Sequence, residues 1–261
     1  MYLRPFLLFC LERVCKYFIL LSEFYLLLKL HFSSLLLIIS FVCPRLFAED
    51  YRVYILGIPI VNVSMEYAND ALSFHTETLG MFHYIWPVDN HYFTEYDSIS
   101  FGVRHYTKSI NQRGYSSEMN CIYKSDSSFL SYNGQSVSIV DSIQNIFTLL
   151  ARVRYQPTEY LDTKWFPMNH EGAPYRARYL WAGTELVDIN NVGILCDHYR
   201  LDIEETEGVG IKVSDWDYFN DHIASHEALR QIWVEKTGKR RIIQASVSIY
   251  GMTVKAEIQD K

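Results

Sequence analysis

Two histidines four residues apart have the spacing of a possible metal site in this 261-residue chain. On a helix His222 and His226 would stand one above the other, with Asp221 and Glu227 beside them. The same spacing holds zinc in the metalloprotease motif His-Glu-x-x-His, where the Glu after the first His is the general base. Here the Glu follows the second His and a third ligand is unassigned, so two solvated histidines are the simpler interpretation. A metal-dependent hydrolase is retained only as the alternative from a different functional class.

A second, looser group of histidines lies near an aromatic-rich stretch, residues 78–92. The group comprises His83, His91 and His105 with Asp89 and Asp97. A histidine among aromatic side chains is more often a packing residue than a ligand. The chain has no Gly-x-Ser-x-Gly elbow and no phosphate-binding glycine loop. We therefore expect no catalytic residue, no cofactor and no metal.

The elements that position these residues are organised around one helical stretch, Asp141–Tyr155. Its apolar residues recur at spacings of three and four, which places them on one face: Ile143, Ile146, Phe147, Leu150 and Val153. Asp141 with Gln144 predicts a capping box at the first turn. Arg152 and Arg154 stand where the helix dipole favours a cation, and Pro157 ends the run. The flanking segments are strand-like, so we expect this helix to pack on the concave face of a curved sheet; a connecting helix on an outer surface is the alternative.

The first 48 residues have the composition of an export leader. Residues 32–42 form an apolar core shorter than the ~20 residues of a membrane-spanning helix. Lys29 and His31 precede this core, and Ala48 offers a cleavage position before Glu49. An earlier apolar run, residues 17–28, contains Glu23, which suggests that translation starts further downstream. The sequence predicts export, with an uncleaved membrane anchor made of both runs as the second choice.

The rest of the chain, residues 49–261, is predicted to be one acidic domain. It holds 19 basic and 28 acidic residues, a net charge of −9, which argues against nucleic acid as a partner. Only Cys121 and Cys196 remain after cleavage, and in an oxidising compartment they can form a disulfide or stay as two separate buried thiols.

Short alternating segments separated by turns fill most of this domain. The best hairpin turn is Asn133–Gly134, because both residues tolerate positive φ. Residues 174–181 and 184–189 are predicted as separate strands, and Ser214–Ser225 as a second short helix. The pattern predicts a mainly β fold: a large curved antiparallel sheet, or half-open barrel, around one central helix.

Four sequence blocks resemble DUF3108, a family of exported bacterial domains of unknown function. The blocks are Tyr51, Val53, Tyr54, Gly57 and Ile58; Gly80 with Trp86-Pro87-Val88-Asp89; Asp141 to Arg152; and Ile232-Trp233-Val234 with Arg240-Arg241 and Tyr250-Gly251. The resemblance spans nearly all of residues 51–258. Three features depart from it: Lys236-Thr237-Gly238 stands where the family usually has an Asp, Ile242 stands where it usually has Pro, and the segment 204–227 is longer than usual.

The resemblance implies structural roles for Gly80, Pro87, Asp89 and Trp233, beside Asp141, Gln144 and Arg152, and no catalytic residues. Its implied fold is that of periplasmic lipoprotein carriers and capsule-associated lipoproteins, in which an apolar cavity can hold a lipid tail. We therefore expect a non-enzymatic periplasmic protein whose partner is a lipid or another apolar ligand. The alternative is an envelope assembly factor with a filled core and a protein partner.

Overall fold

The structure, a computed structural model, describes residues 47–124, 128–208, 210, 211, 213, 217 and 222–259. They belong to one compact unit, Leu46–Lys261. The predicted leader therefore lies outside the described residues except for Phe47 and Ala48. None of the described helices is long and apolar enough to cross a membrane.

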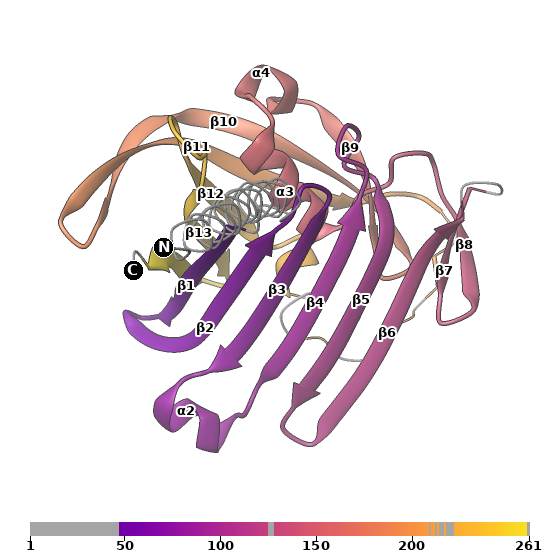
Figure 1. The fold of residues 1–261 in the computed structure, drawn as a ribbon, viewed down its shortest axis with the longest axis horizontal. Helices are drawn as coiled ribbons and strands as arrows, with labels where there is room; N and C mark the ends of the chain where they lie inside the picture. Colours follow the sequence, from indigo (N-terminus) through magenta and orange to yellow (C-terminus); the bar gives the residue numbers. More distant parts are fainter. Residues whose placement is uncertain are drawn as a thin grey trace, which may run out of the picture. The chain divides into compact units, whose positions relative to one another are not determined.

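The described strands form one curved antiparallel sheet, which confirms the predicted fold class (Figure 1). The first eight strands are β1 (Phe47–Ile55), β2 (Ile58–Tyr67), β3 (Ala71–Thr78), β4 (Asp89–Tyr96), β5 (Val103–Gln112), β6 (Tyr115–Lys124), β7 (Phe129–Tyr132) and β8 (Gln135–Ser138). The other six are β9 (Trp165–His170), β10 (Ala173–Ile189), β11 (Val192–Glu205), β12 (Leu229–Glu235), β13 (Ile242–Ile249) and β14 (Met252–Gln259). Within each run, every strand pairs with the next one in sequence.

The two runs join where β1 pairs with β14, which places Tyr51 opposite Ile258. β8 and β9 are then the two edge strands of the open sheet. Residues 143 and 144 connect β5 to the edge strand β9: the Ile143 carbonyl accepts from the Val103 amide of β5, and the Gln144 amide donates to the Pro167 carbonyl of β9. An extended connection thus partly closes the half-open barrel.

The sheet curves around the helix α3 (Ile146–Tyr155), and two shorter helices, α2 (Gly80–Ile85) and α4 (Thr158–Leu161), lie in connections. Phe147 of α3 packs against Phe74, Tyr92 and Tyr106 of β3, β4 and β5, at ring-centroid distances of 5.4, 5.0 and 5.8 Å. Burial of such a side chain stabilises the fold by about 1.5–3 kcal/mol. The helix therefore packs on the concave face, as predicted.

The cap of α3 differs from the prediction. The N-cap is Asn145, whose Oδ1 accepts from the Thr148 amide at 2.9 Å while the Thr148 hydroxyl accepts from the Asn145 amide at 3.1 Å. The capping box of Asp141 and Gln144 is therefore wrong. Because residues 143 and 144 are engaged in extended hydrogen bonding with the sheet, the helix cannot begin before residue 145.

Local turn chemistry was predicted more reliably. Asn133 and Gly134 have φ of 46° and 89° and connect β7 to β8, as expected. The strands predicted at 174–181 and 184–189 instead form the single strand β10, because a bulge between Trp181 and Gly183 keeps both parts paired with β11. Residues 222–224 are helical, and most of the second predicted helix lies outside the described residues.

Candidate functional site

The half of the concave face formed by β3–β6 is sealed. Its inward side chains include Leu72, Tyr92 and Ile110, each 1% exposed, and Phe147 of α3 packs against Tyr92. Arg152 of α3 links the helix to the residues before it and to β9, since its Nε donates to Gln144 Oε1 and its guanidinium lies 4.2 Å from the Phe166 ring.

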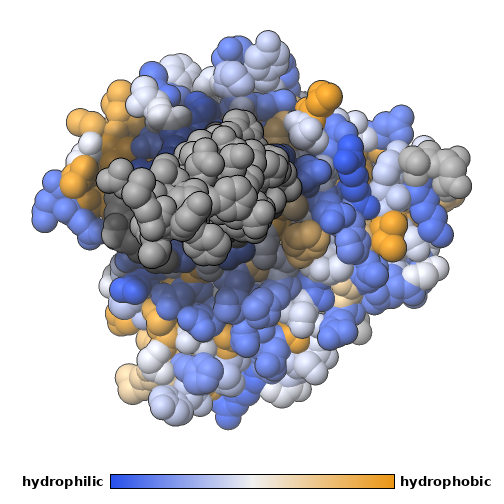
Figure 2. Space-filling view, viewed as in Figure 1, coloured by the Kyte–Doolittle hydropathy of each residue, from blue (hydrophilic) through white to orange (hydrophobic). Residues whose placement is uncertain are grey.

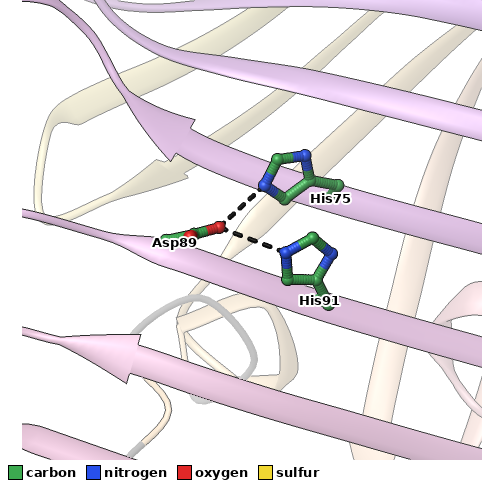
Figure 3. A group of neighbouring side chains, drawn as sticks. All are labelled: His75, Asp89 and His91. Atoms are coloured by element: carbon green, nitrogen blue, oxygen red, sulfur yellow. Dashed lines mark hydrogen bonds and ion pairs between the residues drawn. The ribbon is translucent and has the colours of Figure 1, made fainter.

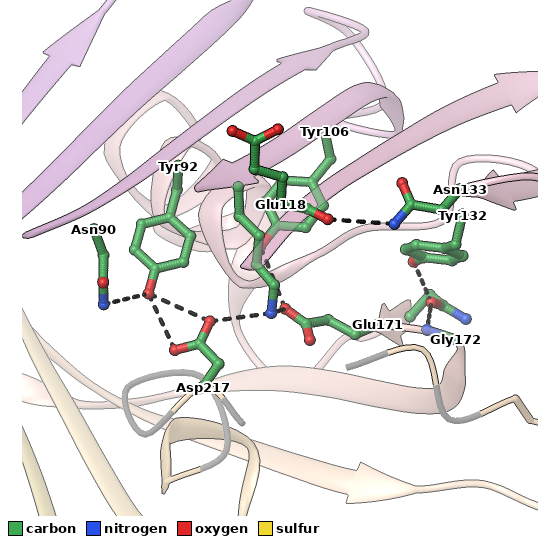
Figure 4. Close-up of polar contacts among 11 residues, drawn as sticks. Asn90, Tyr92, Tyr106, Glu118, Tyr132, Asn133, Glu171, Gly172 and Asp217 are labelled. Carbon is green, nitrogen blue, oxygen red and sulfur yellow. Dashed lines mark hydrogen bonds and ion pairs between the residues drawn. The ribbon is translucent and has the colours of Figure 1, made fainter. Parts of the chain in front are cut away.

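A buried ionic cluster lies in the same half (Figure 4). Lys108 Nζ is 2.5 Å from Glu171 Oε1 and 3.2 Å from Asp217 Oδ2, and Tyr92 donates its hydroxyl to Asp217 at 3.1 Å. Burial and the Asp217 charge raise the pKa of Tyr92, so the phenol stays protonated and donates. Through the ion pair with Lys108, the cluster attaches residue 217 to β5, and its role is structural.

The β9–β10 turn aims Glu171 at Lys108. Glu171 and Gly172 have φ of 47° and 98°, the left-handed conformation that favours glycine. A Cβ at residue 172 would collide with the Ile211 backbone oxygen, so the turn and the segment beside it require glycine there. Nothing in the local sequence shows that this turn carries a buried carboxylate.

The other half of the concave face carries small aliphatic side chains that stay partly exposed. We call this set the aliphatic face: Val53, Val61, Ala245, Val247, Val254 and Ala256. The strand register places Val53 opposite both Val61 and Ala256, and Ala245 also opposite Ala256. The side is the one that faces α3, since Glu49, four residues before Val53 in β1, binds Arg154 of the helix.

At one end of the sheet, beside the aliphatic face, lie four connections that contain no acidic residue. We call them the carboxylate-free end: residues 55–60, 79–88, 110–116 and 249–254. Their only ionisable side chains besides tyrosines are His83 and Arg113. Leu56, Tyr84 and Tyr250 are 85%, 86% and 87% exposed there. In Figure 2, apolar and weakly polar residues gather at the lower left, where Figure 1 places α2 and the β1–β2 turn.

Asp141 lies far from the aliphatic face, in a polar surface cleft of about 470 Å³. Its Oδ1 accepts from the Tyr123 hydroxyl at 3.3 Å. Across the cleft Asp97 binds Arg104 at 2.6 Å, and backbone hydrogen bonds from Ser100 and Ile99 lower the pKa of Asp97 to about 2. A permanently ionised, paired carboxylate is a poor general base, so the cleft offers no catalytic arrangement.

The remaining predicted residues are dispersed. Gly80 begins α2 with φ of 51°, and Pro87 follows that helix, half-buried. Trp233 lies on the convex face, where its ring stacks on His198 at 4.4 Å and its Nε1 donates to Glu185. These three residues shape the scaffold and do not converge on a site.

His222 and His226 do not form a metal centre in the structure. His222 is exposed and helical, whereas His226 lies beyond the helical residues 222–224 with an 84% exposed side chain. The histidine group predicted near the aromatic stretch is also divided, since His105 binds Asn120 and only His91 lies beside Asp89. His75, which sequence reasoning missed, joins that pair.

Both cysteines are free and buried, in agreement with two separate thiols. Burial raises the pKa of Cys121 and of Cys196 to about 12. We therefore expect neither thiol to be alkylated by iodoacetamide in native protein at pH 8, and both to react after denaturation, because the thiolate is the nucleophile. Peptide mass mapping measures this directly; native alkylation of either residue, or a peptide linking the two, would contradict it.

No family model matches this sequence, and no curated protein matches it either. The fold is similar to the crystal structure of a beta-barrel-like protein of domain of unknown function DUF1849 from Brucella abortus: TM-score 0.51 and 6% identity over 84% of this chain and 98% of that chain. The lipoproteins YmcC of Escherichia coli and LppX of Mycobacterium tuberculosis each align over 82% of this chain, and over 84% and 86% of their own, with 10% identity and a TM-score of 0.31. The similarity to the Brucella protein shows a common fold and nothing more, and the resemblance to DUF3108 rests on the four sequence blocks.

Proposed function

We propose that this domain is a non-enzymatic binding protein of the bacterial cell envelope that holds an apolar, lipid-like group against the aliphatic face. One observation carries the proposal. On a single concave surface, the positions under α3 are sealed by large side chains, whereas the six valines and alanines of the aliphatic face remain partly exposed. Small apolar side chains of this kind leave room for a ligand and offer it no polar partner.

The carboxylate-free end supplies the route to this face. An acyl chain gains about 0.8 kcal/mol for each methylene that it removes from water, and a charged group on its path would cost desolvation energy. The four connections at this end place no acidic side chain there, although the whole chain has 30 acidic residues. On the side of Tyr250, Glu227 forms a hydrogen bond with this tyrosine and raises its pKa. A polar residue therefore borders the route there.

The proposal includes export to the periplasm and membership of DUF3108. Export is supported by the apolar core at residues 32–42 and by Ala48, the position where we expect cleavage. Membership is supported by the order of the four sequence blocks. Neither idea requires a nucleic acid, a cofactor or a catalytic residue.

The second candidate is an envelope assembly factor that binds a protein partner. It is favoured by the sealed half of the concave face and by the strongly exposed Met81 and Tyr84 of α2, which suit a protein contact. The two candidates differ in whether the aliphatic face must be vacant for binding.

The substitution Ala256→Trp tests the aliphatic face. Ala256 lies between Val53 and Ala245, so an indole there occupies the space of at least two ligand methylenes. Their loss corresponds to about 1.6 kcal/mol, or roughly a tenfold weaker affinity. Displacement of a fluorescent fatty acid measures the affinity, and native mass spectrometry of protein from the periplasm identifies the lipid that co-purifies.

The matched control is Lys255→Trp, which adds the same ring to the convex face of the same strand. We expect this variant to bind the fatty acid as the unmodified protein does. If both variants bind alike, or if the unmodified protein binds no lipid, the aliphatic face is not a ligand site and the assembly-factor candidate remains.

A further inference from the structure

Three potential metal ligands meet on the convex face of β3 and β4, on the opposite side of the sheet from the aliphatic face (Figure 3). His75 lies directly opposite His91 in the strand register, and Asp89 precedes His91 by two residues. Opposite residues, and residues two apart on one strand, project from the same face of a sheet. The backbone pairing therefore holds all three side chains together.

Their donor atoms already converge. His75 Nε2 and His91 Nε2 lie 2.8 and 3.2 Å from the same oxygen, Asp89 Oδ1, and all three atoms are within 4.8 Å of one another. Zinc bonds of 2.0–2.2 Å in tetrahedral geometry separate two ligand atoms by about 3.3 Å. The two rings are stacked at 4.0 Å with 5° between their planes, and the half-exposed Asp89 and His91 side chains have room to rotate toward that separation.

The charge around the three residues favours a cation. Among the described residues, the ion pairs of Asp89 are with these two histidines, and neither lysine nor arginine contributes. Glu77 lies directly opposite Asp89 and exposed on the same face, whereas the residues opposite His75 and His91 on the outer sides are Ser64 and Ser109. The Glu77 carboxylate is therefore within one strand spacing, and no lysine or arginine among the described residues forms an ion pair with Asp89.

We propose that His75, Asp89 and His91 bind a zinc ion, with the remaining coordination positions open to water or to Glu77. Two imidazoles and one carboxylate are a ligand set that suits zinc, and three protein ligands with an open position are typical of sites that exchange ligands. The ion bridges β3 and β4 just beside α2, and so stiffens the connection that carries the exposed Met81 and Tyr84.

The test is a calorimetric titration of the full exported protein, stripped of metal with EDTA, with zinc chloride. We expect one zinc ion per chain. His75→Ala and His91→Ala should each weaken binding at least about tenfold, since even the loss of an outer-shell partner costs 10–100-fold in affinity. Electron paramagnetic resonance of the Cu²⁺-loaded protein should show two imidazole nitrogens, and only one in either variant.

The matched control is His105→Ala, which removes a histidine from the same convex face on the neighbouring strand, where it binds Asn120. This variant should bind zinc unchanged, and circular dichroism should show that all variants fold. The proposal is overturned if the unmodified protein takes up no zinc, if His75→Ala and His91→Ala keep full affinity, or if zinc is lost instead from a His222→Ala/His226→Ala variant. Zinc uptake and lipid binding are measured separately, so either result stands without the other.

Discussion

Replacement of Lys108 by Met should lower the free energy of unfolding by about 3–5 kcal/mol, because it leaves two buried carboxylates without their cation. Lys108, Glu171 and Asp217 have side chains that are 1%, 6% and 0% exposed. Water cannot replace the ammonium group at such depth. Urea unfolding followed by circular dichroism measures the loss as a shift of the transition midpoint at an unchanged slope.

Two further variants separate charge from packing at this cluster. Lys108→Met combined with Glu171→Gln and Asp217→Asn should recover much of the stability, since neutral partners remove the uncompensated charge. Lys255→Met breaks an ion pair with Glu257 of the same 2.5 Å length at an exposed position, and it should cost about 0–1 kcal/mol. Equal effects of Lys108→Met and Lys255→Met would show that the buried cluster does not stabilise the fold.

Arg154→Met should also cost about 3–5 kcal/mol, since it strands the buried carboxylate of Glu49. Arg154 Nη1 is 2.5 Å from Glu49 Oε1, and its guanidinium lies 4.2 Å from the Tyr67 ring. Burial alone would lower the pKa of Arg154, but the Tyr67 and Glu49 interactions outweigh it and raise that pKa. Loss of this ion pair removes a link between the end of α3 and β1. The same urea unfolding experiment measures the resulting decrease in the free energy of unfolding.

The control for this pair is Arg176→Met. Arg176 binds Glu204 at 2.7 Å with both side chains nearly half exposed, so its loss should cost at most about 1 kcal/mol. Combination of Arg154→Met with Glu49→Gln should restore part of the stability. If the double variant is no more stable than Arg154→Met, the effect comes from lost packing on Tyr67 and not from the stranded charge.

The buried ion pairs were largely hidden from sequence reasoning. In β5, Lys108 lies two residues from both Tyr106 and Ile110, so all three side chains point to the same, buried face. A lysine at an inward position of an alternating strand is the sequence feature that indicates a buried ion pair here. Its partners, Glu171 and Asp217, are 63 and 109 residues away, in a turn and in a segment with no strand pattern. Arg154 was assigned to the helix dipole, because no local pattern pairs it with a glutamate 105 residues earlier.

Alternation and helical spacing, which are local properties, were enough to predict a curved antiparallel sheet around one helix and the turn at Asn133–Gly134. Long-range pairing decided the rest. The bonds of residues 143 and 144 to two strands moved the start of α3 to Asn145, and the register of β3 with β4 put His75 opposite His91, 16 residues away. His226 lies beyond the helical turn, which ends at residue 224, so the helix that would place His222 and His226 one above the other does not reach His226. The aliphatic face is likewise a product of register, since its six residues come from four strands at both ends of the domain, and side-chain spacing within any one strand does not reveal it.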